Sequence, residues 1–293
     1  MASAVFMDHV VSLIPIFLVA MLIERSTSFT VFQSSTLPHR PYNVIRWSAS
    51  PDDDDSTSTV PPVLVVDSMP ERFSHLRHTY YLLRHGQSTA NIASIISSDR
   101  YALAYTDRHG LTAVGYDQGR GAAQDLLDLL LLQEEKLPIA FVSSPFARAR
   151  QTAEACQGEL QDLVKEDEAT SFDILDDISI HDGLMERSFG RLDGEEIRTY
   201  AYVWPLDKFN VTHTAFDVES VAAVCTRFRQ TILDIEMQLS SPHTVVLASH
   251  ADVLQIAQLY AAGVENVGEF SSYRFQSKYY STLAQQQRLC ASL

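Results

Sequence analysis

Polar residues follow directly on two apolar runs of the chain, where their side chains could act together. Arg84 and His85 come after "YYLL", and Ser249 and His250 come after "TVVLA". An arginine offers a planar fork of donors that fits a tetrahedral oxyanion, and it stays charged at any working pH. A histidine is neutral near pH 7 and can therefore act as a nucleophile or a base. These residue types predict an anion site.

Two further residues would complete a reaction. Arg148 lies in "VSSPFARARQT" and Glu186 in "LMERSFGRLDG". A phosphoryl group held by Arg84, Arg148 and His250 would have its oxygen charge offset. His85 could then attack in line, because positioning and electrostatics are most of what phosphoryl transfer requires. Glu186, with its pKa raised by burial, could give a proton to the leaving oxygen and later take one from water. The set needs no metal.

None of these residues is informative by itself. The tripeptide Arg-His-Gly arises by chance on the order of a few times in a hundred chains of this size. An isolated histidine such as His250 is more often a core residue, and "SSP" or a single glutamate indicates nothing. The ordered combination supports the hypothesis.

The site requires strands whose ends meet. Short, apolar, β-rich runs at Thr79–Leu83, Ile139–Ser143 and Thr244–Ser249 are typical of strands covered on both faces. Longer helical patterns lie between them, so we expect an α/β fold with a mostly parallel central sheet and helices on both faces. Ligands of such sheets bind beyond the carboxyl ends of the strands, which predicts that both histidines reach one crevice.

Three long helices are expected. The first is capped by Thr112 and runs through "GRGAAQDLLDLLLLQ". The second covers "FARARQTAEACQGELQDLV", and the third begins at Val218 in "VESVAAVCTRFRQTILDIEMQL".

Composition excludes several classes of function. The chain has 293 residues and a net charge of -15, so a non-specific hold on nucleic acid or on an anionic membrane is not expected. An anionic ligand must be attracted by a local cluster. Cys156, Cys225 and Cys290 have neither disulfide nor metal-ligand spacing and are expected to be buried hydrophobic residues. We expect no metal and no cofactor.

Residues 1–50 have the composition of a targeting presequence. Residues 1–28 contain the apolar run Val10–Ile23, which is shorter than the roughly 20 residues of a membrane-spanning helix and fits a signal segment. Residues 29–50 lack acids and are rich in hydroxyl groups, as transit peptides are. We expect import into a plastid through the secretory route. Entry into the secretory pathway only, or anchoring by residues 10–23, remains open.

An acidic linker follows the leader. Residues 51–77 contain "DDDD" with Ser, Thr and Pro, a composition that cannot bury enough apolar surface to order itself. Residues 78–293 are expected to form the functional domain, with no stable membrane domain once the leader is removed.

The domain closely resembles the histidine phosphatase superfamily, the phosphoglycerate-mutase-like proteins. The resemblance rests on "LLRHGQSTAN", "GLTAVGYDQGR", "FVSSPFARARQTAEA", "LMERSFGRLDG", "VESVAAVCTRF" and "VVLASHADVLQIAQ", which occur in the family's order. It implies that His85 becomes phosphorylated and that Glu186 donates the proton. It further implies a phosphate pocket formed by Arg84, Asn91, Arg148, His250 and the backbone at Ala251.

Two segments depart from the family's pattern. Many members have two glycines after the second histidine, where this chain has Ala251 and Asp252. An aspartate there favours the start of a helix but repels phosphate unless its side chain points away. Asp217 and Val218 replace another usual glycine pair, so the loop over the pocket is expected to have a different shape.

The resemblance implies a small phosphorylated substrate. In a phosphoglycerate mutase, the segment after the glutamate supplies a basic cluster for a second anionic group. Here "GEEIRTYAYVWPLDKFN" has acids and aromatics instead. We therefore expect a metal-independent phosphomonoester hydrolase that works through a phosphohistidine. Mutase-type phosphoryl transfer and a non-catalytic, phosphate-binding regulatory role are the alternatives.

Overall fold

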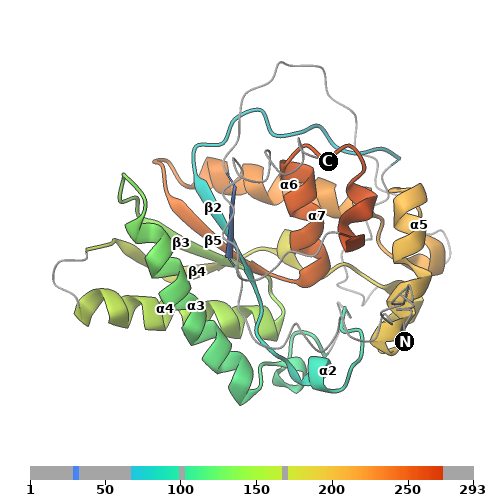
Figure 1. Cartoon of the computed structure of the whole chain (residues 1–293), viewed down its shortest axis with the longest axis horizontal. Coiled ribbons are helices and arrows are strands. Elements are labelled where there is room, and N and C mark those ends of the chain that lie inside the picture. Colours follow the sequence, from blue (N-terminus) through green and yellow to red (C-terminus); the bar gives the residue numbers. More distant parts are fainter. Residues whose placement is uncertain (1–28, 33–66, 99–102, 167–170, 273–293) are drawn as a thin grey trace, which may run out of the picture.

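The centre of the protein is a mostly parallel sheet. A computed structural model describes residues 29–32, 67–98, 103–166 and 171–272 (Figure 1). Within them the strand order is β1-β2-β5-β3-β4. The parallel strands are β2 (Thr79–Arg84), β5 (Thr244–Ser249), β3 (Ile139–Ser143) and β4 (Ile174–Ile180), and β1 (Phe29–Phe32) pairs antiparallel with β2. The expected α/β fold is confirmed.

The predicted strands match the observed ones closely, with one addition. β3 and β5 have the predicted bounds, and β2 extends one residue further to Arg84. Strand β4 was not predicted. Its sequence "ILDDISI" contains Asp176 and Asp177, and its side chains are partly or fully exposed. An edge strand of this kind has no continuous apolar run to reveal it.

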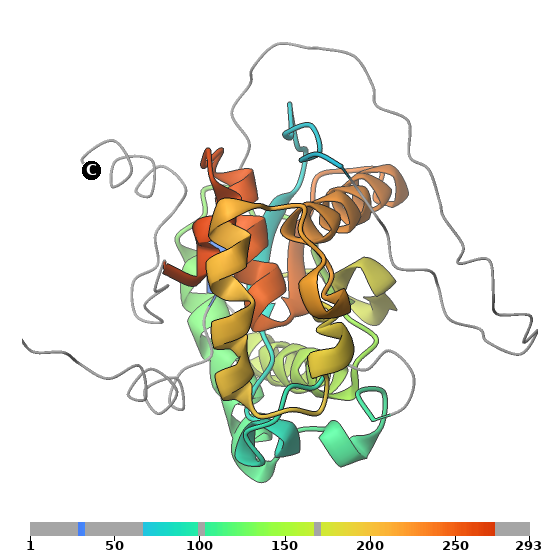
Figure 2. The ribbon, with the colours of Figure 1, turned by 90° about the vertical axis from the view of Figure 1, so that its right-hand side faces the viewer.

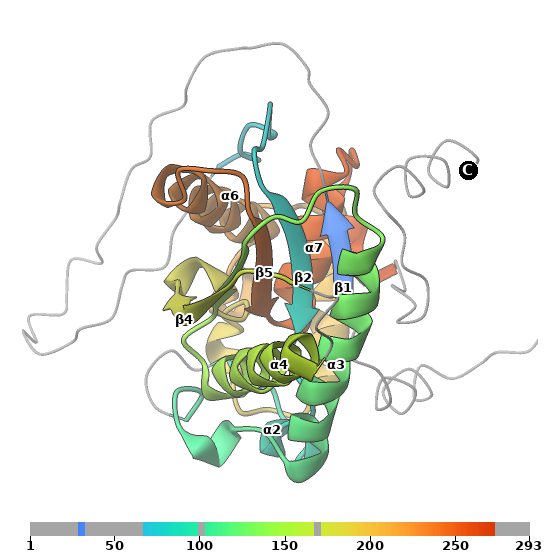
Figure 3. The same cartoon turned by 90° about the vertical axis from the view of Figure 1, so that its left-hand side faces the viewer.

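Helices cover both faces of the sheet, because alternate strand residues point to opposite sides. Leu82 and Leu247 enter one apolar core, and Leu83 and Ala248 enter the other. Figure 3 shows α3 and α4 in front of the sheet, with α6 and α7 behind it. The helices are α3 (Ala113–Leu131), α4 (Ala147–Glu166), α6 (Val221–Gln238) and α7 (Ala251–Ala261).

Side-chain caps set the starts of two helices. Thr112 caps α3, as predicted. Helix α6 begins at Val221, three residues later than the predicted start at Val218. The reason is Ser220, whose hydroxyl accepts the backbone N–H of Ala223 at 3.1 Å and so supplies the N-cap.

Short helices flank the carboxyl ends of the strands. Figure 2 turns the side that carries α5 toward the viewer. The short helices are α2 (Thr89–Ile92), η1 (Asp107–His109), η2 (Asp182–Leu184), η3 (Gly190–Leu192), η4 (Ile197–Tyr202), α5 (Trp204–Phe209), η5 (Ala215–Asp217) and η6 (Val267–Ser272).

Residues ahead of His78, the expected start of the domain, also pack onto it. Leu76 belongs to the core that α6 and α7 cover. The Arg72 guanidinium donates through Nη2 to the carbonyl oxygen of Val264 at 2.5 Å, and the Tyr260 hydroxyl donates to the carbonyl oxygen of Glu71. The last part of the predicted linker is therefore in contact with the domain.

Most of the predicted leader lies outside the described residues. This applies to Val10–Ile23 and to all of residues 1–50 except β1. In the described ranges, no helix has both the length and the apolar composition needed to cross a membrane.

Candidate active site

The two predicted histidines lie together at the carboxyl ends of neighbouring strands. The backbone N–H of His85 donates to the carbonyl oxygen of Ser249 at 3.0 Å, which extends the pairing of β2 and β5 by one residue. The ring centroids of His85 and His250 are 5.1 Å apart. The parallel register brings both rings into one site, as the sequence predicted.

His85 is held as a neutral imidazole. Its Nδ1 lies 2.8 Å from the carbonyl oxygen of Gly86, which only accepts, so Nδ1 has the proton. Its Nε2 lies 3.1 Å from Nε of Arg148, which only donates, so Nε2 has the free electron pair. Burial, together with the charges of Arg148 and Arg84, holds the pKa of His85 well below its usual value. A nucleophilic nitrogen thus faces an arginine.

Arg148 is the second residue of α4, and its guanidinium is anchored by Ser97. Its Nη2 donates to the Ser97 carbonyl oxygen at 2.8 Å, and its Nη1 donates to the Ser97 hydroxyl at 3.2 Å. The Thr152 hydroxyl donates to the Arg148 carbonyl oxygen and accepts the Gly86 N–H, which connects α4 to the loop after β2. Burial lowers the pKa of Arg148 to about 10, so it is charged at neutral pH.

Two buried nitrogens of the cluster have no hydrogen-bond partner among the described residues: Nε of Arg84 and Nδ1 of His250. The other ring nitrogen of His250, Nε2, contacts the Ser144 hydroxyl at 2.9 Å. Burial lowers the pKa of both side chains. A buried polar group without a partner costs about 1–3 kcal/mol, so this cluster is suited to an oxyanion.

Glu186 occupies the site as a buried carboxyl group. It is 8% exposed, and its Oε1 accepts the backbone N–H of Arg187 at 2.9 Å. Burial raises its pKa, against the opposing charges of Arg148, Arg227 and Arg84. A carboxyl group with a raised pKa can hold a proton and donate it to a leaving oxygen.

Asn91 is exposed and belongs to a capping box at the start of α2. Its Oδ1 accepts the backbone N–H and the hydroxyl of Ser88, both at 3.0 Å. That contact orients the side chain and leaves its amide nitrogen as the group that could donate to an anion.

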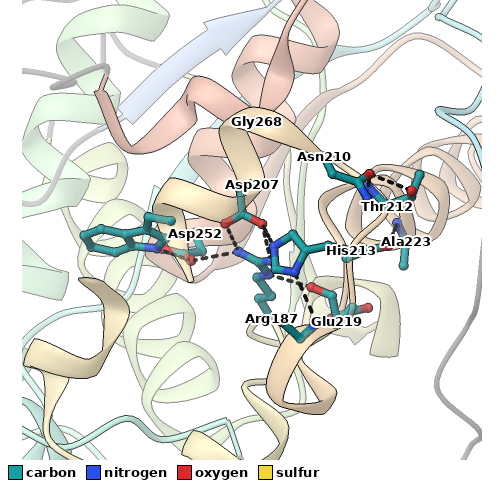
Figure 4. A network of polar contacts seen from close by, with 12 residues as sticks. Arg187, Asp207, Asn210, Thr212, His213, Glu219, Ala223, Asp252 and Gly268 are labelled. Atoms are coloured by element: carbon teal, nitrogen blue, oxygen red, sulfur yellow. Dashed lines mark hydrogen bonds and ion pairs between the residues drawn. The ribbon is translucent and has the colours of Figure 1, made fainter. Parts of the chain in front are cut away.

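The Asp252 carboxyl group is held by Trp204 and Arg187. Figure 4 shows its carboxylate directed at Arg187. Oδ2 accepts Nε1–H of Trp204 at 3.2 Å and lies 3.9 Å from Nη1 of Arg187. Ala251 begins α7 as expected, and backbone N–H groups in a first helical turn have no helical partner. The aspartate therefore leaves the helix start usable by an anion.

Arg187 links the segments around Glu186. It is fully buried and makes a bidentate pair with Asp207 at 2.7 and 2.8 Å, and its Nε donates to the carbonyl oxygen of Glu219 at 2.7 Å (Figure 4). His213 contacts Asp207 through Nε2 at 2.7 Å. Charge-assisted bonds of this kind fix position as well as sign. They hold the loop that carries Glu186 against α5 and the entry to α6.

The loop that departs from the family's pattern has an unusual backbone. Phe216 and Asp217 have φ values of 61° and 59°, which few residues other than glycine adopt. Gly190, with φ of 51°, faces this loop. A Cβ on Gly190 would lie 2.4 Å from the Asp217 carbonyl oxygen, so the close approach of the two segments requires a glycine there.

The part of the chain that forms this site matches a known protein family. Residues 80–279 match the histidine phosphatase superfamily (branch 1), and this range includes every predicted site residue. The match covers more than half of the chain. The chain belongs to this superfamily. Membership of this superfamily indicates catalysis of the phosphatase or the mutase type.

Several solved structures are similar to this histidine phosphatase. A mycobacterial glucosyl-3-phosphoglycerate phosphatase has 19% identity and a TM-score of 0.48, with 65% of this chain and 84% of that one covered. A phosphoserine phosphatase from Entamoeba histolytica has 18% identity and a TM-score of 0.47, with 68% and 86% covered. A putative alpha-ribazole-5'-P phosphatase from Escherichia coli has 17% identity and a TM-score of 0.46, with 68% and 86% covered. No curated protein matches the chain.

Three residues of the site were not predicted. Ser144, in the uninformative "SSP", contacts His250, and Ser97 holds Arg148. Tyr200 stacks on Trp204, the hydrogen-bond donor to Asp252. Hydroxyl residues are too common for composition to single them out. Tyr200 lies in the aromatic segment "TYAYVW", which served in the sequence analysis only as evidence that the basic cluster of a mutase is absent.

Proposed function

We propose that this protein hydrolyses phosphate monoesters of small metabolites through a phosphohistidine at His85, without a metal. The observation that carries the proposal is the contact of His85 Nε2 with Arg148 Nε at 3.1 Å, opposite the proton held on Nδ1 by Gly86. It leaves Nε2 unprotonated, with its electron pair accepting a hydrogen bond from a buried, positively charged guanidinium.

Each step uses groups of this chain. His85 Nε2 attacks the phosphorus atom, and the bond from phosphorus to the leaving oxygen breaks as Glu186 protonates that oxygen. Arg84 and Arg148 offset the charge on the phosphoryl oxygens. Water then attacks the phosphorus atom while the Glu186 carboxylate takes a proton from it, the bond from phosphorus to His85 Nε2 breaks with its electron pair returning to the ring, and orthophosphate leaves.

The pairing of arginines supports a phosphatase over a mutase. A mutase needs free positive charge for a second anionic group. The arginines that follow Glu186 are engaged with carboxylates: Arg187 with Asp207, Arg191 with Asp217, Arg198 with Glu196 and Arg227 with Glu219. Each of these arginines has a carboxylate partner in this chain: Arg187 and Arg227 in the interior, Arg191 and Arg198 at the surface.

Hydrolysis of p-nitrophenyl phosphate and of an alkyl phosphate by the full chain, with and without a chelator, tests the proposal. We expect chelator-resistant release of orthophosphate. His85→Ala should show no turnover and no acid-labile phosphoenzyme, whereas His75→Ala, at an exposed histidine, should match the unmodified protein. Glu186→Gln should lose about 10²–10⁴ in rate on the alkyl ester and much less on the aryl ester, whose leaving group needs no proton.

Three results would contradict the proposal. They are activity that a chelator abolishes and a divalent ion restores, equal and mild losses in His85→Ala and His75→Ala, and transfer of phosphate between two positions of phosphoglycerate at a rate above hydrolysis. Binding of orthophosphate without any turnover would favour the regulatory alternative.

A further inference from the structure

His109, half-buried in the short helix η1, is connected to the site through Ser97. Its Nδ1 lies 2.7 Å from the Ser97 hydroxyl oxygen. Ser97 is 9% exposed and binds Arg148 through both its hydroxyl and its carbonyl oxygen. Arg148 in turn donates to Nε2 of His85, so a continuous series of hydrogen bonds connects His109 to the nucleophile.

The arginine sets the direction of these hydrogen bonds. A guanidinium only donates, so the Ser97 hydroxyl accepts from Nη1 of Arg148 at 3.2 Å. The proton of that hydroxyl is then available for Nδ1 of His109, because a neutral imidazole accepts through one of its nitrogens. A hydroxyl that donates to a good acceptor becomes a better acceptor itself, since neighbouring hydrogen bonds polarise one another. His109 therefore strengthens the bond between Ser97 and Arg148.

The helix that carries Arg148 also fixes the place of His109. Gln151, three residues after Arg148 in α4, donates through Nε2 to Oδ1 of Asp107 at 2.8 Å. Its Oε1 accepts the backbone N–H of Leu111 at 2.7 Å. These two bonds hold both ends of the turn that contains His109. The histidine and the arginine thus have a fixed position relative to each other.

Ser97 has a larger share in holding Arg148 once the reaction has begun. Of the three hydrogen bonds that the guanidinium makes in the described part of the chain, one goes to His85 and two go to Ser97. In the proposed function, Nε2 of His85 becomes bonded to phosphorus and can no longer accept from Arg148. The two bonds to Ser97 then remain to direct the guanidinium.

We propose that His109 is a positioning residue for Arg148: by accepting from the Ser97 hydroxyl, it keeps the guanidinium directed at the phosphoryl group. The inference rests on the proposed function for the role of Arg148. His109 acts through Ser97 and makes no contact with the substrate.

The test compares two substitutions of His109 that differ in one acceptor. His109→Asn keeps an acceptor atom bonded to Cγ, as Nδ1 is, whereas His109→Leu keeps a branched side chain without an acceptor. Titration calorimetry with orthophosphate should show binding about 3- to 10-fold weaker for His109→Leu, the range of one lost hydrogen bond, and within about twofold of the unmodified protein for His109→Asn. His75→Leu, the same change at an exposed histidine, should leave the affinity unchanged.

A double-mutant cycle shows whether the effect passes through Ser97. In a Ser97→Ala background, His109→Leu should weaken orthophosphate binding no further, because the hydroxyl that connects the two residues is absent. Losses that simply add would mean that His109 acts by another route, and they would contradict the inference.

The titration needs no turnover, so it separates this inference from the proposed function. Equal orthophosphate affinity in His109→Leu and the unmodified protein overturns the inference. Equal weakening in His109→Leu and His109→Asn marks a structural role and overturns it as well. Weakened binding in His109→Leu alone, in a protein that hydrolyses no ester, supports His109 and overturns only the proposed hydrolysis. Failure of the unmodified protein to bind orthophosphate overturns both.

Discussion

Glu186 and Arg187 are neighbours in sequence but have opposite electrostatic surroundings. The Glu186 carboxyl group accepts one backbone N–H and has a raised pKa, because burial outweighs the attraction of the nearby arginines. The Arg187 guanidinium is matched by Asp207 on both of its terminal nitrogens. One side chain can therefore exchange a proton while the other fixes the loop.

Asp252 gives a prediction about stability at this scale. Burial first, and then the charge of Glu186, raises its pKa to about 7 in the folded protein, above the ordinary value near 4 of the unfolded chain. A raised folded pKa gives stability that is complete below the unfolded pKa and is lost as the pH rises through the folded one. Asp252→Asn removes this titration and keeps an acceptor for Trp204. Its melting temperature, relative to the unmodified protein, should therefore rise between pH 5 and pH 8.

The matched control is Asp117→Asn, at an exposed aspartate of α3. Its melting temperature should differ from that of the unmodified protein by the same amount at both pH values. A constant difference for Asp252→Asn as well would show that Arg187 keeps Asp252 ionised throughout this range.

At the scale of elements, the loop after β2 is held by close contact with the start of α3. A Cβ on Gly115 would lie 2.1 Å from the Gln87 carbonyl oxygen, and a Cβ on Gly86 would lie 2.4 Å from the Gly115 carbonyl oxygen. The N–H of Thr112 donates to the same oxygen of Gln87 at 3.0 Å. This contact sets where the chain goes immediately after His85.

Substitutions at two of the glycines of α3, Gly115 and Gly121, should have opposite effects. Gly115→Ala must move the backbone next to His85, so we expect it to lower stability by about 1–3 kcal/mol and to reduce kcat. A Cβ on Gly121, which is exposed in the same helix, meets nothing within 4 Å. Gly121→Ala should raise stability by up to about 1 kcal/mol and leave kcat unchanged. Urea denaturation and steady-state kinetics measure both, and a loss of kcat in Gly121→Ala would refute the explanation.

For the molecule as a whole, net charge and local charge have opposite signs. The chain has a net charge of -15, yet the site contains a partly buried Arg84 and a buried Arg148 close to the buried Glu186. Burial reduces screening by salt, so these arginines act strongly over a short distance. Attraction of an anionic ligand is therefore a property of the pocket and not of the protein surface.

The leader gives a prediction for the whole chain. We propose that residues 1–50 direct the protein to a plastid through the secretory route, on the basis of the apolar run Val10–Ile23 and the acid-free segment after it. Peptide mapping of the native protein should then find a mature N-terminus between Ser28 and Thr79. A mature N-terminus beyond Ser50 would also remove β1 and leave β2 at the edge of the sheet. Recovery of intact residues 1–25 from a soluble cytoplasmic fraction would disprove the proposal.

The sequence by itself determined the features that depend on local pattern. β3 and β5 were predicted to the residue, since a parallel strand buried on both faces is a continuous apolar run. The Thr112 cap has a local signal as well. Arg84, His85 and His250 were expected to meet because each stands at the carboxyl end of a strand.

Only the tertiary structure determined the protonation states of the site residues and the directions of their side chains. The unprotonated state of His85 Nε2 depends on its contact with Arg148, 63 positions away in the chain, and the direction of the Asp252 side chain depends on Trp204, 48 positions away. Tyr200 was overlooked for the same reason. A pKa and a hydrogen-bond partner are set by whichever groups lie within a few ångströms after folding, and sequence spacing does not encode those distances.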